Sequence, residues 1–291
     1  MNPRKEPVLP VEQMLFYGEI VKIGRFDCPA EHDCFARTAP LNNDLFVFTR
    51  KPLWWRRGDG AYRFAEPGAA LLHRAGREVE RRDVGLGGDF TDWFGIRSDV
   101  FEETLARHGL HDPDVTEKTV ALVTDPGFRL RETQLVASLQ QRKPSQFAVD
   151  EAALALFDTV CAGLSVDQHQ HRPTGITTRA RRRRLVDRTR ALLDDLDRNH
   201  GNIERNPGLT EIARDVGTSV YHLCRVFRAE CGMTLHAYRQ RQRLGRAIDL
   251  MMTRRQDLTT LAQDLGYSSH SHFSRVFRQH LGVTPSMLNN R

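Results

Sequence analysis

The chain has 291 residues, of which 40% are hydrophobic and 27% charged, and its formal net charge is +6. This length and balance predict a folded, water-soluble protein with room for two domains. The sequence has no apolar run of about 18 or more residues, so we expect no membrane-spanning helix. The first residues also lack the apolar segment of a secretory signal, so we expect no export.

The positive charge is concentrated in the C-terminal part of the chain. Residues 175–291 hold 21 Lys and Arg against 11 Asp and Glu, a net of +10, whereas residues 1–174 have a net of −4. A basic region joined to a mildly acidic one indicates a polyanion-binding domain attached to a second unit. The five cysteines are odd in number and show no dense pattern. They favour a reducing cytoplasm over a disulfide framework.

The region from residue 15 to about residue 97 consists of short apolar runs separated by turn residues. We expect strands at 16–24, 45–49, 53–55, 69–72 and 92–96, with turns at 42–44, 58–60, 66–68 and 85–89. Several short strands with frequent turns indicate a sandwich or barrel. The Pro67-Gly68 turn before an apolar strand resembles one feature of cupin-like sensor domains. We therefore predict a mainly β, cupin-like N-terminal domain followed by helices.

Helical spacing follows the predicted strands. One helix begins at 100–106, and the segments 131–141 and 148–164 are predicted to form an antiparallel pair, interrupted at Pro144-Ser145. The pair could simply cover the sheet, or it could form the interface of a homodimer. The sequence leaves both possibilities open.

One cluster in this domain has the residue types of a soft-metal site. Cys28, His32 and Cys34 lie at short spacing, and thiolates with imidazole can bind such a metal. No second CxxC or HxxxH pair supplies a further ligand, and His73 is remote in sequence. Buried thiols beside a polar histidine at a strand edge account for the residues equally simply. We therefore predict no metal and no other cofactor, and retain these three residues only as candidates.

A polar stretch that contains proline and glycine predicts a linker at 166–180, between an N-terminal domain at 1–165 and a C-terminal domain at 181–291. Five arginines lie within residues 179–184, where a helix begins. Positive charge is unfavourable at a helix N-terminus, so we assign phosphate contacts there and keep a solvated helix start as the alternative. The residues assigned are Arg181, Arg182 and Arg184.

The C-terminal region contains an internal repeat. The run Arg-Val-Phe-Arg at 225–228 recurs 50 residues later at 275–278, and Gly232 recurs as Gly282 at the same offset. A repeat this detailed indicates two copies of one supersecondary unit.

Each copy is predicted to be a helix, a tight turn and a second helix. Gly217 ends the first helix of copy one and Ser219 caps the next; in copy two, Gly266 is followed by Ser268 or Ser269 as the cap. This is the helix-turn-helix pattern, although one copy alone could be a plain helical hairpin. A predicted helix at 234–253 joins the copies. At ~1.5 Å per residue it spans roughly 30 Å, close to the ~34 Å of one DNA turn.

Residues 209–290 resemble the DNA-binding domain of the AraC/XylS family of bacterial transcription regulators. The second copy carries the resemblance, with LAQDLGYS at 261–268, FSRVFR at 273–278 and GVTP at 282–285. The resemblance implies an all-α C-terminal domain in which a long helix joins two helix-turn-helix units. It also implies double-stranded DNA and RNA polymerase as partners, and an N-terminal domain that binds a small-molecule effector or forms a homodimer.

The second helix of each unit should enter the major groove of DNA. The resemblance implies base contacts at the positions of Tyr221, Cys224, Arg225, His270, Ser271 and Arg275. We also predict base contacts for His222 and Ser269, which lie near the two helix starts. Arg228 and Arg278 lie one turn further on, where phosphate contact is expected.

We therefore predict a sequence-specific transcription regulator, an activator that responds to a small-molecule effector, with no catalytic residues. One alternative is a ligand-independent regulator whose N-terminal domain only dimerises. Two others are a cupin-type enzyme with a DNA-binding appendage and a DNA-repair methyl acceptor. The former needs a metal triad and the latter a four-cysteine zinc module, and neither set is evident in the sequence. A last alternative, an architectural basic protein, predicts no sequence preference.

Overall fold

The computed structural model of the chain describes residues 11–36, 38, 41–110, 122–123, 125–141, 144–170, 176–199, 208–253 and 257–289. The strands are β1 (Glu12–Tyr17), β2 (Val21–Pro29), β3 (Leu45–Thr49), β4 (Leu53–Arg56), β5 (Arg63–Ala65), β6 (Ala69–His73), β7 (Glu80–Arg82), β8 (Gly88–Ile96) and β9 (Leu122–Val123). The helices are α1 (Asp33–Ala36), α2 (Ser98–Arg107), α4 (Pro126–Gln141), α5 (Gln146–Gln170), α6 (Ile176–Asn199), α7 (Leu209–Asp215), α8 (Val220–Cys231), α9 (Leu235–Thr253), α10 (Leu258–Asp264), α11 (His270–Leu281) and α12 (Pro285–Asn289).

The N-terminal region is built from two antiparallel sheets. One has six strands in the order β1-β2-β8-β3-β6-β9, and the other has three in the order β5-β4-β7. Trp93 of β8 lies across β2 at Gly24, where an added Cβ would come within 2.7 Å of the indole Nε1. This close approach explains a glycine inside a long central strand, because any side chain there would displace the indole.

The first predicted strand is wrong in one respect. The stretch 16–24 is not a single strand but the hairpin between β1 and β2, in which the Gly18 N–H donates to the Val21 carbonyl at 2.9 Å. Its alternating apolar residues continue through the turn, so periodicity alone did not reveal it. The predicted strands at 45–49, 53–55, 69–72 and 92–96 are confirmed within β3, β4, β6 and β8, whereas β5, β7 and β9 were missed.

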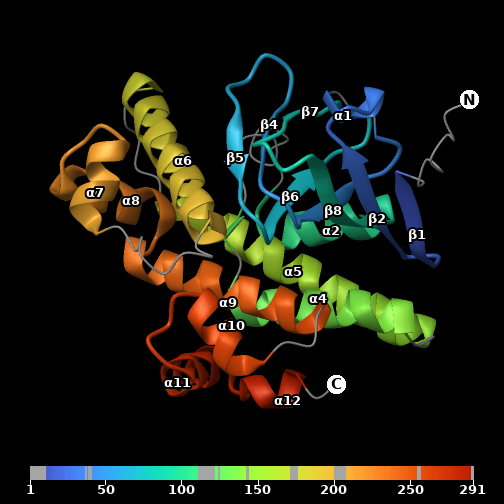
Figure 1. The fold of residues 1–291 in the computed structure, drawn as a ribbon. Helices are drawn as coiled ribbons and strands as arrows, with labels where there is room; N and C mark the ends of the chain where they lie inside the picture. The colour runs from blue at the N-terminus through green and yellow to red at the C-terminus, as the bar shows by residue number, and fades with distance from the viewer. Residues whose placement is uncertain are drawn as a thin grey trace, which may run out of the picture.

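Helices α4 and α5 lie between the six-stranded sheet and the C-terminal helices (Figure 1). The sheet buries aromatic side chains against α5, where Phe46 stacks on Phe157 at 5.3 Å and on Phe94 at 4.9 Å between ring centroids. Helix α4 also contacts α9 and α11, and Leu130 of α4 belongs to the core of the C-terminal helices. One helix therefore packs into both regions.

The C-terminal region is entirely helical among the residues described. Helices α6, α7 and α8 surround one core together with the start of α9, and the rest of α9 surrounds another with α10, α11 and α12. The predicted caps are confirmed: Ser219 accepts from the His222 N–H at 3.2 Å, and Ser269 accepts from the His272 N–H at 3.1 Å. Gly217 and Gly266 adopt φ of +76° and +73°, a left-handed conformation that suits glycine and ends the first helix of each pair.

The predicted linker differs in secondary structure from the expectation. Helix α5 continues to Gln170 and α6 begins at Ile176, so the described parts of 166–180 are helical, while 171–175 lie outside the described residues. The polar residues before position 171 are compatible with a last helical turn. The helix-breaking Pro173 and Gly175 come only after it. None of the helices described is long and apolar enough to cross a membrane.

A network of charged side chains ties the β-rich region to α9. Arg50 donates to Glu132 of α4 at 2.6 Å and to Asp92 of β8 at 2.7 Å, and it reaches Asp249 of α9 at 3.3 Å. Arg129 of α4 also donates to Asp249, at 3.2 Å from its Nε. Because these groups are largely buried, separating the two regions would leave charges without partners, which is costly.

A second set of ion pairs ties the three-stranded sheet to α6. Arg63 of β5 donates to Asp187 at 2.8 Å, and Arg190 donates to Glu66 in the turn before β6. The Arg190 Nε also lies 3.3 Å from the hydroxyl of Tyr238 on α9. The N-terminal region is therefore joined by ion pairs both to α6 and, through Asp249, to α9.

Candidate nucleic-acid interface

Helix α8 presents one face to its core and another to solvent. Leu223, Val226 and Phe227 are buried. Tyr221 is 77% exposed, and Arg225 is exposed one turn further along. His222 and Arg228 are exposed as well. Cys224 is half-buried because it packs against the core, so it is less exposed to solvent than the neighbouring side chains of this face.

Helix α11 repeats this arrangement. Its Phe273, Val276 and Phe277 are buried, whereas its polar positions His270, Ser271, Arg275 and Arg278 are exposed. The Ser269 hydroxyl caps the helix by accepting the His272 N–H, so its oxygen already has one role. The His270 ring lies 3.3 Å from the Ser274 hydroxyl. Helix α11 contains three histidines and two arginines and no acidic residue.

The arginines of these two faces differ from the buried arginines that join the β-rich region to the helices. Within the part of the chain that the structure describes, Arg225, Arg228, Arg275 and Arg278 form no ion pair. Elsewhere, arginines such as Arg50 are neutralised by buried acids. Exposed guanidinium groups without acidic partners remain available to phosphates or to the acceptor edge of guanine.

The basic start of α6 is only partly a free surface. Arg181 and Arg184 are exposed and Arg182 is half-buried, and none of the three has an acidic partner among the described residues. Further along the same helix, Asp187 and Arg190 are buried in the contact with the sheet. Arg181, Arg182 and Arg184 therefore carry positive charge without acidic partners within the described residues, and the later turns of α6 fix its orientation.

Helix α9 sets the separation of the two helix pairs. It has 19 residues, which at ~1.5 Å per residue gives about 28 Å. Leu235 in its first turn belongs to the core that includes α8, and Met251 near its end belongs to the core that includes Leu288 of α12. Gly245 lies on its buried face, where an added Cβ would be 3.1 Å from Cδ of Arg129. The close packing at this glycine is therefore a contact with the N-terminal region.

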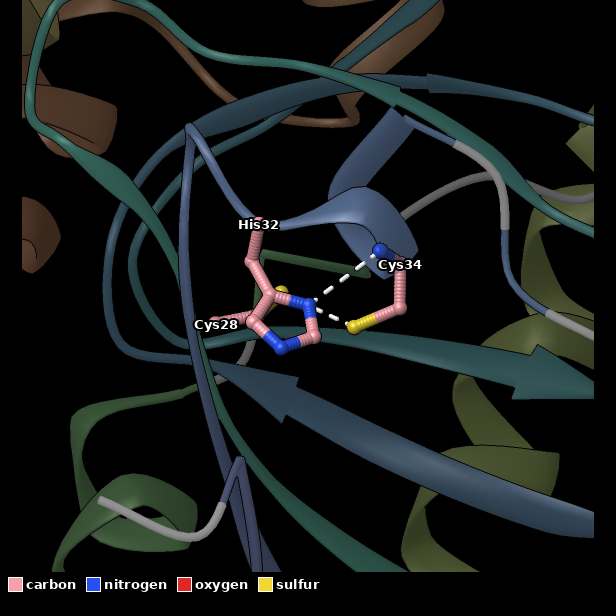
Figure 2. A group of neighbouring side chains, drawn as sticks. All are labelled: Cys28, His32 and Cys34. Atoms are coloured by element: carbon pink, nitrogen blue, oxygen red, sulfur yellow. Dashed lines mark hydrogen bonds between the residues drawn. The ribbon is translucent and has the colours of Figure 1, made fainter. Parts of the chain in front are cut away.

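The candidate metal ligands of the N-terminal domain come together in space (Figure 2). The Sγ atoms of Cys28 and Cys34 are 3.2 Å apart, and the Cys34 N–H donates to Nδ1 of His32 at 3.2 Å. The ligand atoms of these residues all lie within 4.8 Å of one another. Burial and the neighbouring Cys34 raise the pKa of the Cys28 thiol to about 12. His73 does not join this group. It is buried, and its Nδ1 lies 3.2 Å from Nη2 of Arg57.

A cavity of about 370 Å³ lies between the two sheets. Its lining residues could not be predicted from the sequence, because they come from strands far apart in the chain. The lining includes Phe26, Leu45, Val47, Thr49, Leu53, Trp55, Leu71, His73, Val79, Arg81, Asp89, Thr91 and Trp93. The indole N–H groups of Trp55 and Trp93 are buried and find no acceptor among the described residues. Burial and the nearby Arg57 and Arg81 lower the pKa of His73 well below its usual value.

Paired helices that expose unpaired arginines, in a basic all-helical region, define a DNA-binding protein. Residues 212–291 match a family model described as a helix-turn-helix domain. The regulatory protein SoxS of Salmonella typhimurium is 38% identical over 91 residues, which span 31% of this chain and 84% of that protein. The transcriptional activator AarP of Providencia stuartii is 32% identical over 87 residues, or 30% of this chain and 64% of that protein.

The chain belongs to the AraC/XylS family and is a DNA-binding transcription regulator. These matches cover only its C-terminal third. A solved structure of fatty-acid-bound ToxT from Vibrio cholerae aligns with 93% of this chain and 95% of its own, but at 14% identity and a TM-score of 0.35. At that TM-score the alignment adds nothing to the assignment.

Proposed function

We propose that this regulator reads two successive major grooves on one face of duplex DNA. Each of the pairs α7–α8 and α10–α11 is a helix-turn-helix unit, and α8 and α11 are the recognition helices. The observation that carries the proposal is the matched pair Arg225 and Arg275, exposed and without acidic partners within the described parts of the chain. A length of about 28 Å for α9 is compatible with units roughly one DNA turn apart.

The exposed side chains divide by their place on the helix. Those near the N-terminus of a recognition helix reach base edges, so Tyr221, His222, Arg225, His270, Ser271 and Arg275 are proposed as base contacts. Cys224 and Ser269 stay in this set with smaller roles, because one packs on the core and the other caps its helix. Arg228 and Arg278, one turn further along, are proposed to contact phosphate together with Arg181, Arg182 and Arg184 on α6.

The N-terminal region, residues 1–165, is proposed to be a cupin-like sensing domain connected through 166–180 to the DNA-binding domain at 181–291. Its cavity has the size of a small-molecule site. The apolar walls and the two buried indole donors favour an uncharged, mostly apolar effector that carries a hydrogen-bond acceptor. The ion pairs to α6 and α9 provide a physical route from this domain to the recognition helices.

Activation of transcription through RNA polymerase is proposed from the family alone, and a homodimer formed by the N-terminal domain is compatible with it. The relative AarP is described as an activator, which supports the direction of regulation. No catalytic role is proposed for any residue.

The test compares two arginines on one helix. Arg275→Ala should weaken binding to the preferred sequence about 5- to 150-fold, equivalent to roughly 1–3 kcal/mol, and relax the preference at one base position. Arg278→Ala, the matched control on α11, should weaken binding to all sequences alike. Fluorescence anisotropy with the preferred duplex and with single-base variants measures both. Equal loss of affinity for every duplex with Arg275→Ala would make Arg275 a phosphate contact and contradict the assignment.

A further inference from the structure

The N-terminal domain holds a compact group of soft-metal ligands apart from the DNA-binding surface. Cys28 is the penultimate residue of the long strand β2, and Cys34 lies in the one-turn helix α1. The chain between them folds back, because the His32 N–H donates to the Pro29 carbonyl at 3.0 Å. The two sulfurs and an imidazole nitrogen are thereby brought within 4.8 Å of one another (Figure 2). From this geometry we infer that Cys28, His32 and Cys34 form a binding site for one Zn²⁺ ion.

The backbone around the ligands is fixed before any ion arrives. Cys28 pairs with Asp89 across β2 and β8, and Arg81 donates to the Cys34 carbonyl at 2.7 Å. The Cys34 N–H bond to Nδ1 of His32 requires that nitrogen to be unprotonated. The same lone pair cannot accept this N–H and bind a metal at once, so zinc binding would replace the hydrogen bond through rotation of the half-exposed His32 ring.

Charge balance favours a divalent ion. Arg81 and Asp89, beside the cysteines, form a buried pair at 2.6 Å that is neutral overall. Two thiolates and a neutral imidazole add two negative charges, which Zn²⁺ cancels and a monovalent ion would leave half-compensated. Uncompensated charge in a buried site is costly, so this ligand set fits Zn²⁺ better than Cu⁺.

The side-chain shifts required are small. Zn–S bonds of about 2.3 Å and Zn–N bonds of about 2.0–2.1 Å in a tetrahedron put the ligand atoms roughly 3.5–3.8 Å apart. The sulfurs, now 3.2 Å apart, must separate by about half an ångström. The two ligand atoms that lie farthest apart, within 4.8 Å, must approach each other by about 1 Å. Side-chain rotation of the half-exposed His32 and Cys34 can supply both shifts.

Three protein ligands leave one zinc position for water or another molecule, as in sites that exchange a ligand. Cys34 also lines the cavity between the sheets. An ion bound to its sulfur would therefore border that cavity, and zinc occupancy would alter the wall that faces a bound molecule. The zinc site itself stands independently of the effector role proposed above.

The proposal is tested by zinc binding to the full-length, reduced protein. Protein freed of metal with a chelator is titrated with Zn²⁺ in competition with a chromogenic chelator, and then with Co²⁺, whose visible spectrum reports thiolate ligands and tetrahedral geometry. The chain should bind one ion. His32→Ala and Cys34→Ala should each weaken binding more than the roughly 10- to 100-fold typical of losing an outer-shell group.

Two matched variants control for general effects of losing a histidine or a cysteine. His236→Ala removes an exposed histidine of α9, and Cys231→Ala removes a half-buried thiol of α8; both should bind zinc as the parent chain does. The half-exposed His32 keeps the test decisive if a variant at the buried Cys28 fails to fold. Reduced protein that binds no zinc, or that binds it equally in all variants, would overturn the proposal. Formation of a Cys28–Cys34 disulfide in air by a chain that ignores zinc would overturn it too, and would make the pair a redox couple.

Discussion

The packing of Arg129 against α9 makes the effect of one substitution depend on another. Gly245→Ala in an ordinary helix stabilises by about 0.8–1.0 kcal/mol. Here the new Cβ would lie 3.1 Å from Cδ and 3.4 Å from Nε of Arg129, closer than the roughly 3.5–4.0 Å of a favourable carbon contact. Asp249 binds the guanidinium of Arg129, and the turn at Gly68 lies so close to it that an added Cβ would collide with it. The arginine therefore has little room to move away.

The change in the free energy of unfolding caused by Gly245→Ala is the balance of the gain in helix propensity and the cost of crowding Arg129. Overpacking costs about 1–3 kcal/mol, so it should cancel or exceed the gain in helix propensity, and Gly245→Ala should leave the parent chain unchanged or less stable by up to about 2 kcal/mol. In an Arg129→Ala background the obstruction is gone, and the same change should stabilise by about 1 kcal/mol. The coupling energy between the two positions should therefore be about 1–3 kcal/mol.

Urea unfolding of the four chains, followed by circular dichroism, measures this coupling. Arg131→Ala, on the exposed side of α4, is the matched background, and the effect of Gly245→Ala should be the same there as in the parent chain. If Gly245→Ala stabilised the parent and the Arg129→Ala chain by the same amount, Arg129 would not pack against α9 at Gly245 as described.

Three further predictions concern charge, core and DNA binding. Burial raises the pKa of Glu132 from 4.5 to about 7, so the Glu132 carboxyl stays protonated to a higher pH in the folded chain than in the unfolded chain. The free energy of unfolding should therefore fall as pH rises between these values, by up to about 1.4 kcal/mol per pH unit; Glu132→Gln should remove this part of the pH dependence, and an unchanged profile would contradict it. Phe277→Ala, at a fully buried ring, should cost about 3–5 kcal/mol in thermal unfolding, against less than about 0.5 kcal/mol for Met287→Ala, which is 64% exposed. Arg184→Ala should reduce the slope of log affinity for DNA against log salt concentration by about 0.9; an unaltered slope would remove Arg184 from the phosphate contacts.

The parts of the fold that sequence predicted are those encoded locally. The caps at Ser219 and Ser269 depend on bonds that reach only three residues along the chain, so residue type and spacing were sufficient. The buried faces of α8 and α11 follow from helical periodicity in the same way. The exposed positions of Arg225 and Arg275 follow as well, whereas their contacts with DNA stay predictions.

What sequence missed depends on partners far apart in the chain. Arg50 and Asp249 are separated by 199 residues, and nothing near either one indicates a buried network. The hairpin at Gly18 was missed because its turn continues the apolar alternation of the strands. The cavity is lined from both sheets, so its walls exist only after the strands have paired.

Selection of binding sites from random duplexes tests whether one chain reads two successive major grooves. We predict a motif with two short conserved elements about 10–10.5 base pairs apart. Arg225→Ala should relax one element and Arg275→Ala the other. A selection that returned no motif, or a motif confined to a single groove, would contradict the account.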